Sequence, residues 1–373
     1  MKERFSLKDH LFNKDTVTYL ADLFVAVDAT FNKKKFVNEV VGKFPELELK
    51  ARIVWITEVL ARHLPSDPGD AMKLIVRALP SPLDPNKTDD DFGRFIFAPL
   101  GEYVVQNGCT KKYLKQSLAT LKQITMRFSM EDAMRAFLNN FPTETLAQYD
   151  NWVTDKNYHV RRLVSESTRP SLPWSKKLTL EYTVPLRYLD ILHADPTRYV
   201  TRSVANHLND ISKKDAPLVV STLTQWHSQK KQKPAELNWI TRHALRTLVK
   251  KGDTEALALL GYSHHVLPDV SNLTVLPRVQ KGDKLLFSFT LTATATQNLM
   301  IDYVIDFVKK NGGTKPKVFK IKKVSVKEGE TIVIQKNHLL KADSTTFNLN
   351  AGTHTVTIQI NGHKLATAQF EVV

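Results

Sequence analysis

The residues best suited to chemistry lie in one short segment, Val160-Arg-Arg-Leu-Val-Ser-Glu-Ser-Thr-Arg-Pro-Ser-Leu-Pro-Trp174. In a helix, Arg162 and Glu166 are four residues apart and share one face. Pro170 and Pro173 break the helix and predict an extended turn that holds up Trp174. A carboxylate can stabilise positive charge that develops in a reaction, and a tryptophan can stack on a cation for about 0.5–2 kcal/mol. This segment is the candidate site. Each feature also has a structural alternative: Arg162 and Glu166 could be a solvated ion pair on the helix surface, and Trp174 could fill the space between two repeats.

Several familiar catalytic layouts are absent from the sequence. It contains no HExxH, CxxC or GxSxG motif, its 12 histidines are scattered, and none of its 13 glycines forms a phosphate-binding loop. Cys109 is the only cysteine, which rules out an internal disulfide framework and a thiolate metal cluster. We therefore expect no metal, no organic cofactor and no nucleotide-binding fold.

Positive charge is concentrated in the part of the chain that holds this segment. The net charge is +15, and residues 151–252 contribute 18 Lys and Arg against 8 Asp and Glu, a net of +10. Residues 270–373 carry a further +7, from 14 basic and 7 acidic residues. A net charge of this size is informative about binding partners, and the basic segment predicts that the partner is a polyanion.

The basic segment repeats itself with a period of 40 residues. Tyr158-His-Val-Arg-Arg162 matches Arg198-Tyr-Val-Thr-Arg202 and Asn238-Trp-Ile-Thr-Arg242. This period is typical of HEAT-like helical pairs, which stack into a solenoid because one pair cannot bury its apolar face alone. The sequence therefore predicts that the three arginines form a ladder along one surface.

Two sequence patterns divide the chain into an α-helical part and a β part. Apolar residues recur with helical spacing in the stretches 48–63, 70–79, 92–106, 113–128, 130–140, 184–193, 216–227 and 254–261. From residue 273, about seven alternating β-branched runs are separated by turns such as Asn311-Gly-Gly and Asn361-Gly-His. We predict a multidomain protein: an all-α HEAT-like repeat solenoid (1–262), a linker (263–272) and an all-β immunoglobulin-like sandwich (273–373), without the usual disulfide.

No membrane or export segment is expected. No apolar run approaches the roughly 18 residues that cross a bilayer, and the first residues lack the apolar stretch of a signal peptide. We expect a cytoplasmic, nucleoid-associated monomer.

The segment 160–174 resembles the signature of the AlkC-type DNA alkylation repair glycosylases, a branch of the HEAT-like repeat glycosylases. Phe95-Ile-Phe-Ala-Pro-Leu-Gly-Glu-Tyr-Val104, Val204-Ala-Asn-His-Leu-Asn-Asp210-Ile-Ser-Lys213 and the β-rich tail also resemble members that carry an immunoglobulin-like domain. The resemblance covers essentially the whole chain. Ser167 stands where the resemblance leads us to expect glycine.

The resemblance implies base excision repair of double-stranded DNA. The enzyme would hydrolyse the N-glycosidic bond of cationic alkylated bases, N3-methylcytosine or N3-methyladenine, without fully rotating the base out of the duplex. The implied catalytic residues are Glu166, Trp174 and Glu131. The implied DNA-binding residues are Arg162, Arg169, Arg202, Asn206, Asp210 and Arg242. The sandwich would clasp the duplex from the other side, with Lys320, Lys322 and Lys323 as candidates.

Each assignment has a structural alternative. Glu131 follows Ser129 at a capped helix start and could only complement the helix dipole. Asn206 and Asp210 could end a helix and hold the next repeat, and Asp210 could also orient a side chain or a water. The sandwich lysines could be an ordinary soluble surface. For the whole chain, the alternatives are a non-catalytic HEAT-like binder of bent or branched DNA, and a solenoid that binds proteins.

Overall fold

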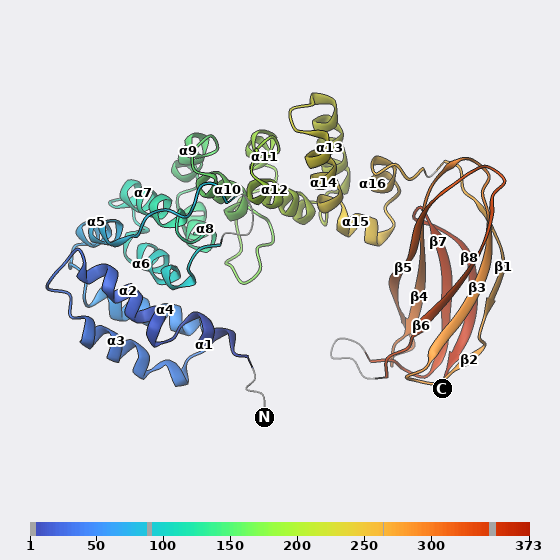
Figure 1. Cartoon of the computed structure of the whole chain (residues 1–373), viewed down its shortest axis with the longest axis horizontal. Helices are drawn as coiled ribbons and strands as arrows, with labels where there is room; N and C mark the ends of the chain where they lie inside the picture. Colours follow the sequence, from blue (N-terminus) through green and yellow to red (C-terminus); the bar gives the residue numbers. More distant parts are fainter. Residues whose placement is uncertain (1–4, 88–91, 264, 343–347) are drawn as a thin grey trace. The chain divides into compact units, whose positions relative to one another are not determined.

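The computed structural model of the chain describes residues 5–87, 92–263, 265–342 and 348–373, and Figure 1 shows helices followed by strands. The first helices are α1 (Leu7–Leu11), α2 (Lys14–Val25), α3 (Lys33–Gly42), α4 (Leu49–Ala61), α5 (Pro68–Ala78), α6 (Ala98–Gly108), α7 (Leu114–Thr125) and α8 (Glu131–Asn140). The later helices are α9 (Pro142–Trp152), α10 (Tyr158–Ser167), α11 (Leu186–Leu192), α12 (Arg198–Ile211), α13 (Ala216–Gln229), α14 (Pro234–Ala244), α15 (Arg246–Lys251) and α16 (Thr254–Leu259). Each predicted helical stretch overlaps one of these helices, so the helical part of the predicted fold class is confirmed.

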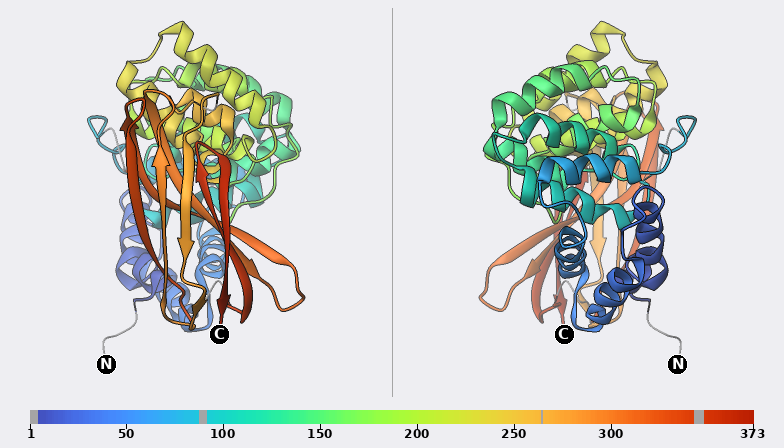
Figure 2. Two further views of the ribbon diagram at one scale, coloured as in Figure 1. Left: turned by 90° about the vertical axis from the view of Figure 1, so that its right-hand side faces the viewer. Right: turned by 90° about the vertical axis from the view of Figure 1, so that its left-hand side faces the viewer.

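The 40-residue repeat corresponds to helices α10, α12 and α14. Val160, Val200 and Ile240, the apolar positions of the repeat, are all fully buried. Helix α10 packs against α12 and also contacts α7, α8, α9 and α11 (Figures 1 and 2). The apolar positions of the repeat are therefore core residues, as the period predicts.

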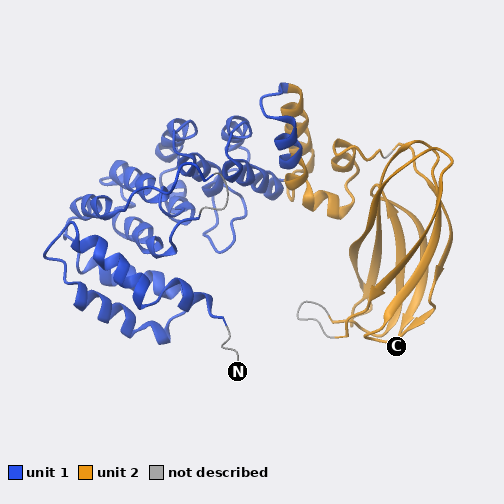
Figure 3. Cartoon of the chain, viewed as in Figure 1, with its two compact units in different colours: residues 1–211, 229–240 blue, residues 212–228, 241–373 orange. Residues whose placement is uncertain are grey.

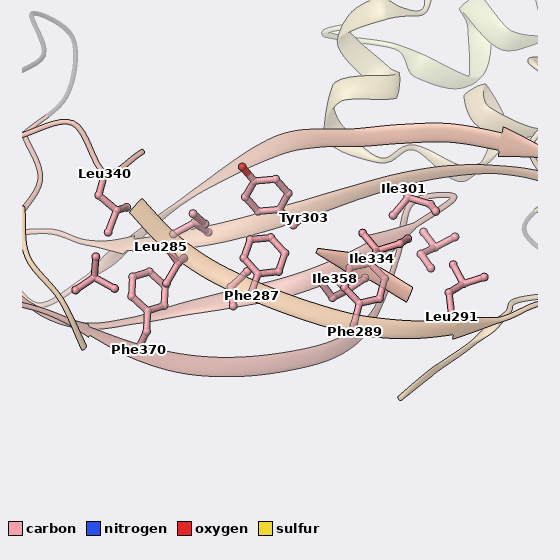
Figure 4. Packing of buried hydrophobic residues seen from close by; sticks show 14 of the residues in the cluster. Leu285, Phe287, Phe289, Leu291, Ile301, Tyr303, Ile334, Leu340, Ile358 and Phe370 are labelled. Atoms are coloured by element: carbon pink, nitrogen blue, oxygen red, sulfur yellow. The ribbon is translucent and has the colours of Figure 1, made fainter. Parts of the chain in front are cut away.

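Two antiparallel-rich sheets form the β part. The strands are β1 (Asp269–Val275), β2 (Arg278–Val279), β3 (Lys284–Thr292), β4 (Gln297–Val308), β5 (Thr314–Val326), β6 (Thr331–Leu339), β7 (Gly352–Ile360) and β8 (His363–Val372). One sheet has the order β1-β3-β6 and the other β2-β8-β7-β4-β5. Phe287, Phe289, Tyr303, Ile358 and Phe370 belong to the apolar core of these strands (Figure 4).

Strand β1 begins at Asp269, so its first four residues lie in the predicted linker (263–272). Residue 264 of that linker lies outside the described residues. Asn272 has a left-handed backbone (φ 54°), and the pairing with β3 shifts register between Ser271 and Thr274. Asparagine tolerates this conformation, and a bulge interrupts the alternation that marks a strand. The last four residues of the predicted linker, 269–272, therefore belong to strand β1, next to its register shift.

The chain divides into two compact units, residues 1–211 with 229–240, and residues 212–228 with 241–373 (Figure 3). The change from helix to strand falls between Leu259 and Asp269, but α15 and α16 group with the sandwich. Gly252 and Gly362 allow this docking, because both have positive φ and a Cβ on Gly362 would lie 2.2 Å from the carbonyl oxygen of Gly252. The compact units therefore divide earlier in the chain than the change in secondary structure.

Candidate active site

Helices α8, α10 and α12 bring five charged side chains into one buried cluster, which we call the ion cluster. It consists of Glu131 from α8, Arg162 and Glu166 from α10, Arg169 from the turn after α10, and Asp210 from the last turn of α12. With three carboxylates and two guanidiniums, these five side chains carry a formal net charge of −1. All but Glu131 are buried.

Glu166 lies at the centre of the ion cluster and is only 5% exposed. Its Oε1 accepts a hydrogen bond of 2.7 Å from Arg169 Nη1, and its Oε2 accepts one of 2.6 Å from the Ser203 hydroxyl. Arg162 Nη2 lies 3.7 Å from Oε2. Burial alone would raise the pKa of the Glu166 carboxyl, but Arg162, Arg169 and Ser203 outweigh burial and hold the pKa below its ordinary value. Glu166 is therefore ionised at neutral pH.

Arg162 joins the two glutamates. Its Nη1 donates to the Ser129 hydroxyl at 2.7 Å and lies 3.9 Å from Glu131 Oε2, while its guanidinium stacks 4.3 Å from the centre of the Tyr199 ring. Glu131 Oε2 and the Tyr199 hydroxyl are buried and have no hydrogen-bond partner among the described residues. A buried polar atom without a partner is costly, so each of these two atoms could bind a water molecule or a polar ligand.

Arg169 is held between two carboxylates. Its Nε and Nη2 each lie 2.9 Å from Asp210 Oδ2, and its Nη1 binds Glu166. Arg162 and Arg169 are 7% and 9% exposed. Both guanidiniums bind carboxylates, and the expected phosphate contacts of these two arginines stay a prediction.

The expected DNA contact of Asp210 likewise stays a prediction. Asp210 is buried and binds Arg169, so orientation of a side chain is the role that the geometry favours. Glu131 occupies the first turn of α8, where it complements the helix dipole, and it also lies beside Arg162.

Trp174 is 84% exposed and has a left-handed backbone, with φ of 69°. A bulky residue rarely adopts this conformation, which costs on the order of 1 kcal/mol or more. Its exposure is incompatible with a plug between two repeats. Strain at an exposed aromatic residue stabilises nothing locally and points to a functional role.

Arg135, which the sequence analysis missed, fixes the turn that carries Trp174. It is 1% exposed, its Nη1 donates to the carbonyl oxygens of Ser167 (3.2 Å) and Arg169 (2.9 Å), and its Nε donates to that of Lys176. Lys50 also donates to the carbonyl oxygen of Trp174. From the sequence, Arg135 is expected to form an exposed ion pair with Glu131, four residues earlier on the same helix. Only its apolar neighbours on α8 indicate that it is buried.

Ser167, where glycine was expected, lies in the last turn of α10. Its hydroxyl donates to the Leu163 carbonyl oxygen and lies 2.6 Å from the Tyr149 hydroxyl. A helical backbone needs no positive φ, so serine fits this position and adds a hydrogen bond.

The arginines of the predicted ladder occupy three different environments. Arg162 is buried, Arg202 is half-buried on α12, and Arg242, in the second compact unit, is exposed. Asn206 is half-buried on α12, one turn after Arg202. Repeat equivalence places these residues at matching positions but does not give them equal access to a phosphate.

Lysines gather elsewhere in the second unit. A hollow of about 660 Å³ between α15 and the five-stranded sheet is lined by four of them, Lys250, Lys251, Lys317 and Lys364. Burial, then the nearby charges of Lys315 and Lys250, lower the pKa of Lys317. Of the expected sandwich lysines, Lys320 and Lys323 are exposed and Lys322 is half-buried, and Lys323 lies over the Tyr262 ring. Lysines crowded together repel one another, and an anion between them relieves that repulsion. The hollow is therefore a stronger candidate for a phosphate site than the surface of Lys320, Lys322 and Lys323.

Within the residues that the structure describes, no group of three His, Cys, Asp or Glu side chains is arranged to hold a metal ion. Across the same residues, every helix falls short of the length and apolar character that a membrane crossing requires.

Comparison with known proteins gives matches to the C-terminal part and to nearly the whole chain. The family model "Uncharacterised protein YhaZ, C-terminal Ig-like domain" matches residues 269–373. The protein YhaZ of Bacillus subtilis (strain 168) is 34% identical over 367 residues, which cover 97% of this chain and 98% of YhaZ. A solved structure of the alkylpurine DNA glycosylase AlkC of Pseudomonas fluorescens, bound to DNA containing an abasic site analog, is 34% identical, with a TM-score of 0.80 over 99% of this chain and 100% of that chain.

Proposed function

The chain belongs to the family of Pseudomonas fluorescens AlkC and Bacillus subtilis YhaZ, and we propose on this premise that it is a DNA glycosylase. Its substrates are bases that carry a positive charge after N3-methylation, N3-methyladenine and N3-methylcytosine, in double-stranded DNA. The AlkC relative is named for alkylpurines, so N3-methylcytosine extends the proposal to a pyrimidine.

The observation that carries this proposal is the ionised carboxylate of Glu166 inside a cluster of net charge −1. Cleavage of an N-glycosidic bond builds positive charge on the deoxyribose, and a fixed carboxylate stabilises that charge. Arg162 and Arg169 keep Glu166 ionised and oriented. Glu131, whose side chain is 24% exposed and whose Oε2 lacks a partner among the described residues, is suited to hold the attacking water.

A methylated base that is already cationic leaves without strong protonation, so the site needs no general acid. Trp174, exposed and held in a strained turn by Arg135, stacks on the sugar or on the cationic base. Because the aromatic group projects outward, the lesion is recognised without full rotation into a pocket.

Contacts with the DNA backbone come from residues outside the ion cluster. Arg202 and Asn206 on α12, Arg242 on α14 and the lysines around Lys250 and Lys317 supply cations or donors for phosphates. We further propose that the enzyme acts as a monomer in the cytoplasm, at the nucleoid.

The proposal is tested by incubating the protein with randomly methylated duplex DNA and separating the freed bases by chromatography. The expected result is release of N3-methyladenine and N3-methylcytosine, with the sugar–phosphate backbone left intact. Binding of the duplex without any freed base would instead identify the chain as a non-catalytic binder of bent or branched DNA.

A further inference from the structure

We propose that Ser203 is a positioning residue for Glu166, donating the hydrogen bond that fixes the carboxylate oxygen Oε2 toward the reacting sugar. The inference deepens the proposed function and rests on it. None of the sequence features that single out residues 160–174 points to this serine, which lies 37 residues after Glu166 on a different helix.

Ser203 belongs to a polar stripe on α12 that faces α10. The stripe follows helical spacing and consists of Tyr199, Ser203, His207 and Asp210, all buried. Its members contact α10 and the turn after it in order. Tyr199 stacks on Arg162, Ser203 binds Glu166, His207 binds the Ser165 carbonyl, and Asp210 binds Arg169. One helix face therefore sets the positions of the charged groups on its neighbour.

The hydrogen-bond directions in this stripe are determined by chemistry. Ser203 Oγ lies 2.6 Å from Glu166 Oε2 and 2.9 Å from Ser165 Oγ, but a hydroxyl has one proton. The ionised carboxylate can only accept, so the Ser203 proton goes to Glu166 and Ser165 donates to Ser203. His207 Nδ1 lies 3.0 Å from the Ser165 carbonyl oxygen, which also only accepts, so Nδ1 carries the proton. Burial, reinforced by Arg169, lowers the pKa of His207 to about 4, so this ring is neutral and keeps that tautomer.

These directions leave Glu166 with one defined donor on each oxygen. Arg169 holds Oε1 and Ser203 holds Oε2. A carboxylate offers about four lone-pair sites, so each oxygen keeps capacity for the substrate while its rotation is blocked. A positioned charge stabilises a transition state better than one that must reorganise.

The test compares Ser203→Ala with wild type under single-turnover conditions on duplex DNA carrying N3-methyladenine. We expect base release to slow at least about fivefold, while DNA affinity changes less than about twofold, because one hydrogen bond to a charged group is lost and no phosphate contact changes. Ser203→Cys, which keeps a weak donor of similar shape, should give an intermediate rate. Ser221→Ala removes an exposed serine on α13 and serves as the matched control.

The pH profile separates positioning from a merely structural effect. Loss of the Ser203 donor lets the pKa of Glu166 rise, so the acid limb of the rate profile should move to higher pH in Ser203→Ala and remain in place in Ser221→Ala. The titratable groups that face Glu166 are Glu131, Arg162, Arg169, Tyr199, His207 and Asp210. None of these is altered in either variant. A rate and an acid limb equal to wild type in Ser203→Ala would overturn the inference.

A direct measurement keeps the inference separate from the proposed function. With glutamate labelled at the carboxyl carbon, and Glu166→Gln used to assign the signal, NMR titration reports the Glu166 pKa in wild type and Ser203→Ala. If wild type releases no base, the proposed function fails, and an upward shift in this titration would still support Ser203 as the residue that positions Glu166. An unchanged titration would reject that role whatever the activity. If Ser203→Ala does not fold, Ser203→Cys provides the same titration.

Discussion

Replacement of Glu166 by glutamine tests the centre of the proposed mechanism. Glutamine keeps the shape of the side chain but offers one acceptor oxygen and one donor NH₂ group. The oxygen can face Arg169, and the NH₂ group can donate to the Ser203 hydroxyl, which turns to accept. The packing therefore survives, and the change removes the negative charge.

The loss of stability in Glu166→Gln depends on which partners Arg162 and Arg169 keep. Removing one partner of a buried ion pair costs about 3–5 kcal/mol when the other is left alone. Arg162 keeps Ser129 and Glu131, and Arg169 keeps Asp210. We therefore expect Glu166→Gln to lower the free energy of unfolding by about 1–3 kcal/mol. Base release should slow at least about tenfold, since one transition-state carboxylate contributes more than about 1.4 kcal/mol.

The assay is single-turnover release of N3-methyladenine, with DNA affinity measured by fluorescence anisotropy and folding by thermal denaturation. Glu144→Gln is the matched control, because Glu144 is exposed on α9. A folded Glu166→Gln protein that binds lesion DNA and releases base as fast as wild type would remove Glu166 from the mechanism.

Four further outcomes follow from the same structure. Trp174→Ala should slow base release at least about tenfold, with the melting temperature within about 2 °C of wild type, because the side chain is 84% exposed. Arg135→Ala should lower the free energy of unfolding by about 2–4 kcal/mol and make residues 168–177 sensitive to protease, since buried carbonyls lose their donor. Lys250→Ala and Lys317→Ala should each reduce the slope of log affinity against log salt by about one unit if they bind phosphates. The folded state lowers the pKa of Glu166, so the ionised carboxylate stabilises the fold fully above the ordinary pKa of 4.5, and this stabilisation is lost as pH falls through the folded-state pKa. The free energy of unfolding should therefore fall less on acidification in Glu166→Gln than in wild type.

The fold could be predicted from the sequence because the patterns that indicate it are visible in the sequence itself. A period of 40 residues and apolar spacing within each helix predict the stacked pairs, and Val160, Val200 and Ile240 are indeed core residues. Alternating runs predict the sandwich. Strand β1 was concealed because its bulge at Asn272 replaces alternation with turn-forming residues.

The site could be predicted only in part, because its partners lie far apart in the chain. The spacing of Arg162 and Glu166 suggests an exposed pair, whereas Tyr199 and Ser203 from α12 cover both side chains. Nothing near Arg135 in the sequence shows that it holds backbone carbonyls more than 30 residues away. Charge alone did not show that Arg162 and Arg169 bind carboxylates, and their predicted phosphate contacts stay a prediction.

The buried ion cluster is itself an argument for function. Helices α10 and α12 pack against each other, and they carry fully buried apolar residues such as Val164, Val204 and Leu208. Buried ion pairs contribute little or no net stability compared with apolar residues of similar volume, because each charge must leave water. Five charged groups in the ion cluster are therefore poorly explained by folding alone. The proposed function accounts for them, because it requires a carboxylate that stays ionised and oriented toward a cationic substrate.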